Sequence, residues 1–251
     1  MTALRSRDNP KVRRWSRLAR DGRFRRQEGC ALIEGPHLLA AALEKQLNLS
    51  ALLVVEDELS NREIRKLIEK TAASPIILSA RLFRAIVDAE NPPGIAAEIT
   101  IPRRPVDERA DCVFLEGVQD AGNVGTIIRS AAAFGVETLY LARGCADAWS
   151  PKVLRAGMGG HFALSIRESQ NFHGKLVCAM PRGGTPLKDA DLSGPLCWAF
   201  GSEGGGVSRE LQARAAMHVT IPTAPGTESL NVAAAAAVCF FEAFSRRAGG
   251  S

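Results

Sequence analysis

The residues best suited to chemistry lie in three polar loops in the second half of the chain. The first, residues 117–129, is a glycine-bearing turn that enters a predicted helix, and such a turn offers free backbone N–H groups to an anion or a nucleotide. It is not a P-loop, because Asn123 and Val124 stand where that motif requires lysine and a hydroxyl residue. Nucleotide hydrolysis is therefore not expected. Taken alone, Asn123 could equally be a helix cap and Arg129 a surface charge.

The other two loops are weaker when each is considered alone. Residues 200–207 include four glycines, which allow a backbone to approach a ligand closely, and Glu203 is the only charged residue among them. Residues 221–231 lead into an alanine-rich helix, which Ser229 and Asn231 could simply cap. The combination is more informative than its parts, because each loop joins an apolar strand to a helix and together they supply asparagine, arginine, glutamate and serine.

The elements that must position these loops form a repeating β/α pattern. Strands are predicted at 112–115, 138–142, 162–166, 176–180, 196–200 and 218–221, with helices at 124–134, 151–158, 208–215 and 232–246. Near-continuous apolar strands joined by helices predict a parallel sheet that is covered on both faces. Sites on such sheets lie where the carboxyl ends of the strands feed into loops. No G-x-G-x-x-G sequence is present, so the fingerprint of a dinucleotide site is missing.

The first hundred residues predict a second, smaller α/β domain. A helix should begin at residues 8–10, where a capping side chain precedes a proline. Strands are predicted at 31–33, 52–55, 76–78 and 95–99, and further helices at 36–46, 62–71 and 80–87. Residues 101–111 contain prolines and mixed charges and are predicted to be a linker. The expected domains are therefore 1–100 and 112–251.

The positive charge of the chain is concentrated at one end. Residues 1–27 hold ten Lys and Arg against two Asp, a net charge of +8, so the other 224 residues sum to −3 within the total of +5. Arg13, Arg14 and Arg17 lie on a helix whose apolar side carries Val12 and Trp15. A solvated helix face is the simple interpretation, and contact with the phosphates of a polyanion is the functional one.

Composition excludes several classes of protein. The longest uncharged apolar stretch, residues 232–241, is shorter than the roughly 18 residues that a membrane span needs. The basic start lacks the apolar core of a signal peptide, although an arginine-rich transit peptide is an alternative. The six cysteines form no C-x-x-C pair and are expected to be reduced core thiols, with no bound metal. We expect a soluble cytoplasmic protein.

Taken as a set, the three loops resemble the motifs of a known family. Asn123, Gly125 and Arg129, then residues 201–204, then 221–222 with 229–231, are similar in order and spacing to the motifs of SpoU-type (TrmH-like) RNA 2′-O-ribose methyltransferases of the SPOUT superfamily. Residues 150–159 resemble the family's intermediate segment. The first hundred residues, including 33–35, resemble the L30e/L7Ae-type substrate-binding domain of two-domain members. Ala121 and Gly157 depart from the usual pattern and put loop rigidity and substrate fit in question.

This resemblance implies a fold, a cofactor and residue roles. It implies a homodimer whose C-terminal domain has a deep trefoil knot that binds S-adenosylmethionine, and it implies an RNA substrate, ribosomal rather than transfer RNA. The implied cofactor-binding residues are Gly201, Glu203, Ile221, Leu230 and Asn231. The implied catalytic residues are Asn123, Arg129, Glu203, Ser229 and Asn231. Arg129 would act as a base or, because a guanidinium stays protonated, as a clamp on the RNA phosphate.

Other functions remain open from the sequence. The same reaction on transfer RNA is one, and a non-enzymatic RNA-binding or ribosome-assembly factor on the same scaffold is another. A small-molecule nucleotide enzyme is disfavoured by the incomplete P-loop and the basic N-terminus. No histidine has a serine or cysteine partner in a recognisable hydrolase motif, and His218 on an apolar strand is expected to be structural.

Overall fold

The computed structural model describes residues 4–226 and 228–249, and it divides the chain into two compact units. The N-terminal unit contains the residues up to Pro102 together with Asp147–Phe162. The C-terminal unit contains Arg103–Ala146 and the residues from Ala163 onward. A segment from the middle of the sequence therefore packs with the first unit, which the sequence did not predict.

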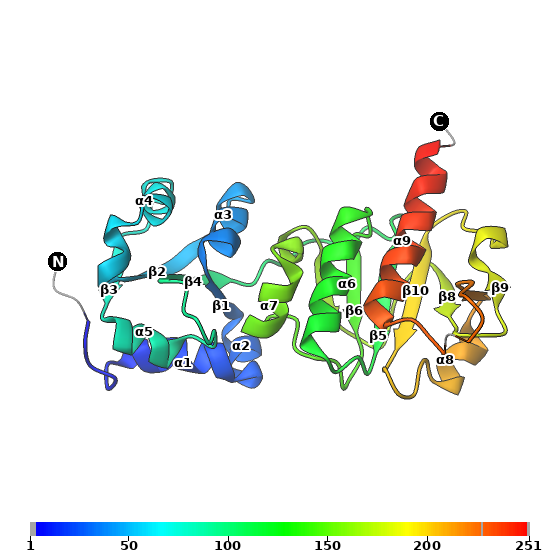
Figure 1. Cartoon of the computed structure of the whole chain (residues 1–251), viewed down its shortest axis with the longest axis horizontal. Coiled ribbons are helices and arrows are strands. Elements are labelled where there is room, and N and C mark those ends of the chain that lie inside the picture. The colour runs from blue at the N-terminus through cyan, green and yellow to red at the C-terminus, as the bar shows by residue number, and fades with distance from the viewer. Residues whose placement is uncertain (1–3, 227, 250–251) are drawn as a thin grey trace. The chain divides into compact units, whose positions relative to one another are not determined.

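The N-terminal unit is built on a four-stranded sheet in the order β1-β4-β2-β3. β4 runs antiparallel to both β1 and β2, whereas β2 and β3 are parallel. Helices α1 and α5 cover one face and α3 and α4 the other (Figure 1). The strands are β1 (Cys30–Glu34), β2 (Leu49–Val55), β3 (Pro75–Leu78) and β4 (Ile95–Thr100). The helices are α1 (Pro10–Arg20), α2 (Gly22–Glu28), α3 (Pro36–Glu44), η1 (Glu56–Ser60), α4 (Arg62–Glu69), α5 (Ala80–Ile86), α7 (Pro151–Gly157) and η2 (Gly160–Phe162).

Helix α1 begins as its sequence predicts. The Asn9 side chain accepts the N–H of Lys11, and Pro10 occupies the first turn, where its missing N–H is not needed. Val12, Trp15 and Leu18 are buried in one apolar cluster with α5 and the sheet. Helix α2 was not predicted, because its arginine-rich sequence has no apolar periodicity, but Asp21 caps it by accepting the N–H of Phe24.

The C-terminal unit contains a seven-stranded sheet in the order β7-β6-β5-β10-β8-β11-β9, and every pair in it is parallel. The predicted parallel sheet is therefore confirmed. The strands are β5 (Cys112–Glu116), β6 (Thr138–Leu141), β7 (Ser165–Glu168), β8 (Lys175–Ala179), β9 (Thr185–Pro186), β10 (Leu196–Gly201) and β11 (Met217–Thr220). The helices are α6 (Ala121–Ala133), η3 (Leu187–Asp189), α8 (Arg209–Arg214) and α9 (Val232–Gly249). The deep trefoil knot stays a prediction.

One strand prediction needs correction, and one strand of the C-terminal unit was missed. The strand predicted from residue 162 begins at Ser165, because residues 160–162 form a short 3₁₀ helix that buries Phe162. An apolar run predicts burial without distinguishing a strand from a helical turn. The two-residue strand β9 was missed, because its threonine and proline are exposed and give no apolar pattern.

The side chains of β10 alternate between the two faces of the seven-stranded sheet, and both faces are covered. Cys197 and Ala199 belong to the apolar cluster that includes Leu211 of α8. Trp198 and Phe200 point the other way and pack edge-on against Phe240 of α9. Helices α6 and α9 lie side by side over this second face (Figure 1). The central strand is thus held on both sides up to Gly201, where the glycine-rich loop begins.

The cysteines lie mainly in the interior as free thiols. Cys112, Cys178, Cys197 and Cys239 are buried, and Cys30 and Cys145 are half-buried. Burial raises the pKa of the Cys178 thiol to about 11 and that of Cys239 to about 12, so both thiols stay protonated near neutral pH. Residues 4–226 and 228–249 contain no cluster of three or more side chains suited to a metal ion. Within the same residues, no helix is long and apolar enough to cross a membrane.

Candidate active site

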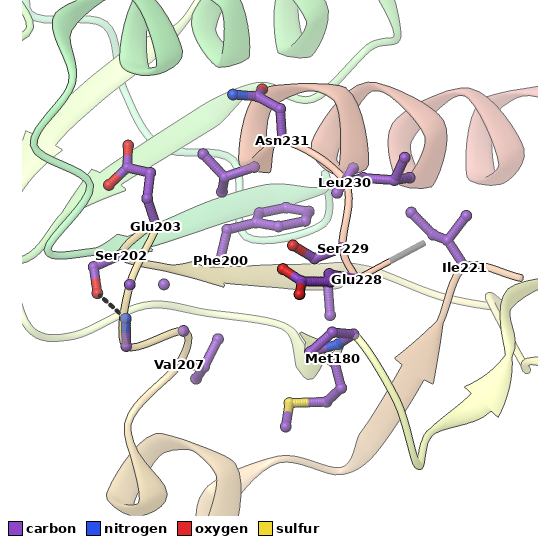
Figure 2. Close-up of a pocket in the computed structure, with 18 of the residues that line it drawn as sticks. Met180, Phe200, Ser202, Glu203, Val207, Ile221, Glu228, Ser229, Leu230 and Asn231 are labelled. Atoms are coloured by element: carbon purple, nitrogen blue, oxygen red, sulfur yellow. Dashed lines mark hydrogen bonds between the residues drawn. The ribbon is translucent and has the colours of Figure 1, made fainter. Parts of the chain in front are cut away.

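A cavity of about 620 Å³ opens at the carboxyl ends of β8, β10 and β11. It lies between the glycine-rich loop that follows β10 and residues 228–232, which lead into the first turn of α9 (Figure 2). Met180, Phe200, Val207 and Ile221 give it an apolar lining. All five predicted cofactor-binding residues line this cavity, namely Gly201, Glu203, Ile221, Leu230 and Asn231. Ser229, a predicted catalytic residue, lines it as well.

The glycine-rich loop is folded tightly back on itself. The Gly206 N–H donates to the Ser202 carbonyl at 2.8 Å, and the Gly205 N–H donates to Ser202 Oγ at 3.1 Å. A Cβ on Gly201 would lie 1.9 Å from the carbonyl carbon and oxygen of Gly206, far inside van der Waals contact. Glycine is therefore required at position 201 for the loop to close, and the backbone at this cavity edge is free of bulky side chains.

Glu116 fixes the far end of the same loop. It is the last residue of β5 and pairs with Gly201 in the sheet. Its carboxylate accepts the N–H of Ser208 at 2.7 Å, and the Ser208 hydroxyl accepts the N–H of Leu211 at the start of α8. The loop is thus anchored at its first residue and just beyond its last. Sequence reasoning missed Glu116, although its place at the end of a buried strand beside the site could have indicated it.

Three of the predicted catalytic residues form one hydrogen-bonded chain. Asn231 Nδ2 donates to Asn123 Oδ1 at 2.9 Å, and Asn123 Nδ2 donates to Glu203 Oε1 at 2.8 Å. These residues come from the three separate loops. Asn231 also caps α9, because its Oδ1 accepts the N–H of Ala233 at 2.9 Å. The cap of α6 is Asp120, which accepts the Asn123 N–H, so the Asn123 side chain is left for the chain of hydrogen bonds.

Arg129 lies apart from the cavity. It follows Asn123 by six positions on α6, which corresponds to about 9 Å along a helix and a different face. Its side chain is exposed and makes no hydrogen bond or ion pair with any residue in the described part of the chain. The structure therefore brings Asn123, Glu203, Ser229 and Asn231 to one place but does not bring Arg129 there within a single chain.

The basic helix α1 contains both bound and exposed arginines. Arg13 and Arg17 are exposed, and the Arg17 guanidinium lies 3.9 Å from the centre of the Phe24 ring. With Arg7 they border a second depression of about 380 Å³. Arg14 instead donates to the buried Glu98 at 2.8 Å and also pairs with Glu28. Hydrogen bonds to these two carboxylates hold the pKa of Arg14 above its ordinary value.

A buried carboxylate in the N-terminal unit also has a structural role. Glu34 accepts the backbone N–H groups of Asp88 and Ala89 at 2.8 and 3.2 Å. Arg155, on α7, donates to Glu34 at 3.0 Å and to Asp88 at 2.9 Å. Burial raises the pKa of the Glu34 carboxyl above its ordinary value. This cluster joins the segment around α7 to strand β1.

The histidines are structural rather than catalytic. His218 is half-buried and bonds through Nε2 to the Gln212 carbonyl at 3.1 Å, as expected for a structural residue. His161 is fully buried and bonds through Nε2 to the Ala148 carbonyl at 2.8 Å, while its Nδ1 has no partner among the described residues. Burial lowers the pKa of His161 to about 4.

Both halves of the sequence are similar to known protein families. Residues 111–241 match the SpoU rRNA Methylase family, and residues 9–97 match the MRM3-like substrate binding domain. An uncharacterized tRNA/rRNA methyltransferase of Synechocystis is 33% identical, over 97% of this chain and 93% of its own length. The 23S rRNA (guanosine(2553)-2′-O)-methyltransferase RlmP of Bacillus subtilis is 29% identical, over 96% of this chain and 98% of its own.

A solved structure extends the likeness to three dimensions. The SpoU methyltransferase AviRb of Streptomyces viridochromogenes, in complex with the cofactor AdoMet, superposes with a TM-score of 0.86. It is 26% identical in sequence, and the match covers 97% of this chain and 100% of that one. The likeness therefore extends over both units and includes the carboxyl edge where the cavity lies.

Proposed function

The chain belongs to the SpoU rRNA methylase family, and from this premise we propose how its residues perform the family's reaction. The protein is an RNA methyltransferase that uses S-adenosylmethionine to modify a ribose 2′-hydroxyl, with ribosomal RNA as its substrate class. A non-enzymatic RNA-binding factor is not favoured, because the polar residues of all three motif loops are present and three of them are hydrogen-bonded together.

The cavity fits this cofactor in size and chemistry. Ligand pockets for molecules of this class measure about 300–1,000 Å³, and this one falls within that range. Its apolar lining suits an adenine ring, while the glycine edge lets a ligand approach the backbone closely. We assign cofactor binding to Gly201, Ile221 and Leu230, with Glu203 and Asn231 at the polar side.

The remaining residues position the RNA for transfer. When bound, the cofactor supplies a methyl group on a positively charged sulfur. The ribose 2′-oxygen must approach that methyl group in line, so alignment should supply much of the rate. Asn123 is held between Glu203 and Asn231, which both line the cavity, and Ser229 adds a hydroxyl to the same lining. This hydrogen-bonded chain is the observation that carries the assignment.

Arg129 is assigned to the RNA phosphate. A guanidinium remains protonated in proteins, so it is better suited to hold the adjacent phosphate and to stabilise charge developing on the 2′-oxygen than to remove a proton. Because Arg129 lies away from the cavity of its own chain, we propose a homodimer in which the site forms between subunits. Phe241 and Phe244 of α9 support this, since both are exposed and contact the Phe134 ring to form an apolar surface.

The N-terminal unit is proposed to bind the RNA. We assign residues 1–100 to substrate binding, 101–111 to a linker and 112–251 to methyl transfer, supported by the two family matches, with residues 147–162 of the last range packed into the N-terminal unit. Arg13 and Arg17 are the proposed phosphate contacts, whereas Arg14 holds α1 to the sheet through Glu98. A ribosomal RNA substrate also supports a cytoplasmic location for the enzyme.

A methyl-transfer assay tests the proposed function directly. The protein would be incubated with S-adenosylmethionine labelled on its methyl group and with ribosomal or transfer RNA from cells that lack the gene. We expect label on a ribose 2′-oxygen of ribosomal RNA, located by resistance of the adjacent bond to alkaline hydrolysis. Label on a base, label only on transfer RNA, or no transfer at all would contradict the proposal.

A further inference from the structure

The charged residues among the described lining of the cavity all have the same sign. Two of its described lining residues are ionisable at neutral pH, and both are carboxylates, Glu203 and Glu228. No lysine, arginine or histidine is among the lining residues in the part of the chain that the structure describes. A concave surface lined by one sign of charge raises the local concentration of ligands of the opposite sign. The cavity is therefore suited to a ligand with a net positive charge.

The two carboxylates are in different situations. Glu203 accepts a hydrogen bond from Asn123, which is itself bonded to Asn231. Glu228 is exposed and has no hydrogen bond or ion pair with any described residue. Figure 2 shows its carboxylate between Ser229 and Met180, on the side that faces the glycine-rich loop. Glu228 is thus the carboxylate that has no hydrogen-bond partner among the described residues, whereas Glu203 belongs to the hydrogen-bonded chain.

The methyl donor and its product differ mainly in charge. S-adenosylmethionine carries a sulfonium, an ammonium and a carboxylate, a net charge of about +1 at neutral pH. On transfer, the bond between sulfur and methyl carbon breaks, a bond between methyl carbon and ribose oxygen forms, and the electron pair stays on sulfur. The 2′-hydroxyl proton is released to solvent. The product, S-adenosylhomocysteine, is a neutral thioether with a net charge of about zero.

We propose that Glu228 makes the cavity select the methyl donor over its demethylated product. The inference rests on the proposed cofactor function and deepens it. An unpaired carboxylate at the cavity attracts the charged donor, and this attraction falls when the sulfonium charge disappears. Loss of charge during the reaction therefore weakens binding and favours exchange of product for fresh donor. Glu228 is a specificity-determining residue in this account, and it takes no part in bond making.

The test compares three ligands with wild type and with Glu228→Gln by isothermal titration calorimetry. The ligands are S-adenosylmethionine, S-adenosylhomocysteine and sinefungin, an analogue in which a carbon bearing a protonated amine replaces the sulfonium. We expect Glu228→Gln to weaken both cationic ligands by about fivefold and to change S-adenosylhomocysteine by less than about twofold. Glu228→Asp keeps the charge and should keep most of the selectivity.

Glu137→Gln is the matched control. Glu137 is also an exposed carboxylate of the C-terminal unit, but it immediately precedes β6 and so lies at the amino edge of the sheet, opposite the cavity. Its substitution should leave all three affinities unchanged. A second readout is ionic strength: raising salt should reduce the wild-type preference for the donor, and should do so less in Glu228→Gln.

Each other outcome has a definite meaning. An unchanged affinity ratio in Glu228→Gln, or an equal loss for all three ligands, would overturn the inference, because the residue would then act through shape and not through charge. An effect of the same size in Glu137→Gln would also overturn it, because the selectivity would then be a property of net charge. If wild type bound none of the three ligands, the proposed cofactor function would itself be wrong.

Discussion

Individual residues at this site serve either the fold or the chemistry, and the structure separates the two. Gly201 is required by the fold, because any side chain there would meet the backbone of Gly206. Asn123 is available for chemistry, because Asp120 already caps its helix. Asn231 has both roles, since one oxygen caps α9 while its amide nitrogen donates to Asn123.

Gly201 and Gly204 form a matched pair for testing the loop. A Cβ at Gly201 lies 1.9 Å from Gly206, whereas a Cβ at Gly204 meets nothing within 4 Å. Gly201→Ala should therefore open the loop, lower the thermal stability by several degrees and weaken S-adenosylmethionine binding by more than about tenfold. Gly204→Ala should fold with unchanged stability. Equal melting temperatures for Gly201→Ala and wild type would contradict this account.

Arg129 should matter for transfer and not for cofactor binding. We expect Arg129→Ala to bind S-adenosylmethionine with wild-type affinity and to lose methyl transfer by about a hundredfold or more, because a positive charge at the reacting oxygen is removed. Calorimetry and labelled-methyl transfer measure the two properties separately. Activity within a few-fold of wild type would exclude Arg129 from the reaction. Arg209→Ala, on α8 and outside the cavity lining, is the matched control.

The sequence predicted the site residues better than their surroundings. Asn123, Glu203, Ser229 and Asn231 stand in recognisable order, and the structure brings them together. Glu116 and Glu228 were missed, because an isolated carboxylate acquires meaning only when its neighbours in space are known. The same limit applies to Arg14, whose partner Glu98 is 84 residues away in the chain.

At the scale of elements, α1 has one buried side and one exposed side that carries positive charge. Trp15 and Arg14 reach the two oxygens of the buried Glu98, so the helix is fastened to β4 by charge as well as by apolar contacts. Arg13 and Arg17 point outward beside the depression that Arg7 also borders. Neighbouring arginines on one helix are therefore expected to serve different properties: Arg14 serves stability, and Arg13 and Arg17 serve RNA binding.

Substitution on α1 distinguishes these two roles. Replacing Arg13 and Arg17 with alanine should weaken RNA binding and reduce the slope of log Kd against log salt by about 1 to 2, with cofactor affinity unchanged and stability lowered by no more than about 1 kcal/mol, from the loss of the Arg17 contact with Phe24. Arg14→Ala should instead lower the free energy of unfolding by about 3 kcal/mol, because it leaves the buried Glu98 without its cation. Filter binding over a range of salt concentrations and denaturant unfolding measure the two effects. An unchanged salt slope in the double variant would rule out the proposed contacts.

His161 gives the segment after α7 a dependence on pH. Its pKa falls from 6.5 in the unfolded chain to about 4 in the fold, because the ring is buried. Between these values the unfolded chain binds more protons, so stability is lost as pH falls, by about 2 kcal/mol from this residue between pH 7 and 5. Denaturant unfolding at both pH values should show that His161→Gln loses less stability than wild type. Equal losses in both proteins would contradict the prediction.

Element types were predictable from the sequence, but some boundaries and directions were not. Apolar alternation with helices predicted the parallel sheet of the C-terminal unit, which the structure confirms. The antiparallel direction of β4 was not predicted, because direction depends on which strands become neighbours and not on local sequence. Helix α2 was not predicted for a different reason. It has no apolar stripe, and it is stabilised instead by the Asp21 cap and by the burial of Arg25.

At the scale of the whole molecule, the position of Arg129 outside its own cavity bears on the assembly. A complete set of polar groups would form if Arg129 of one subunit met the cavity of the other, in an interface related by a twofold axis. Mixing two impaired variants, assayed at a cofactor concentration that Gly201→Ala binds poorly, tests this arrangement. Arg129→Ala and Gly201→Ala subunits, exchanged by mild denaturation and refolding, should regain about a quarter of wild-type activity, because half of the dimers then hold one intact site.

The mixing experiment has two decisive outcomes. No recovery, despite evidence of exchanged subunits from a tag on one variant, would show that each site is built within one chain. Recovery that rises and then saturates as one variant is added in excess to a fixed amount of the other would support the shared site. Each variant refolded alone is the control and should show no gain over its own residual activity.

The discontinuous N-terminal unit has a consequence for the exchange of modules between related enzymes. Residues 9–97 match a substrate-binding domain, yet Asp147 and Arg155 from the segment around α7 bind Arg25 and Glu34 of that domain. A chimaera that replaces only the contiguous N-terminal sequence would remove Arg25 and Glu34, the buried partner of each ion pair, and leave the partly exposed Asp147 and Arg155 without their partners. The proposed substrate-binding unit therefore includes residues 147–162 in addition to the N-terminal sequence, and we expect substrate specificity to be transferred only when both segments are exchanged together.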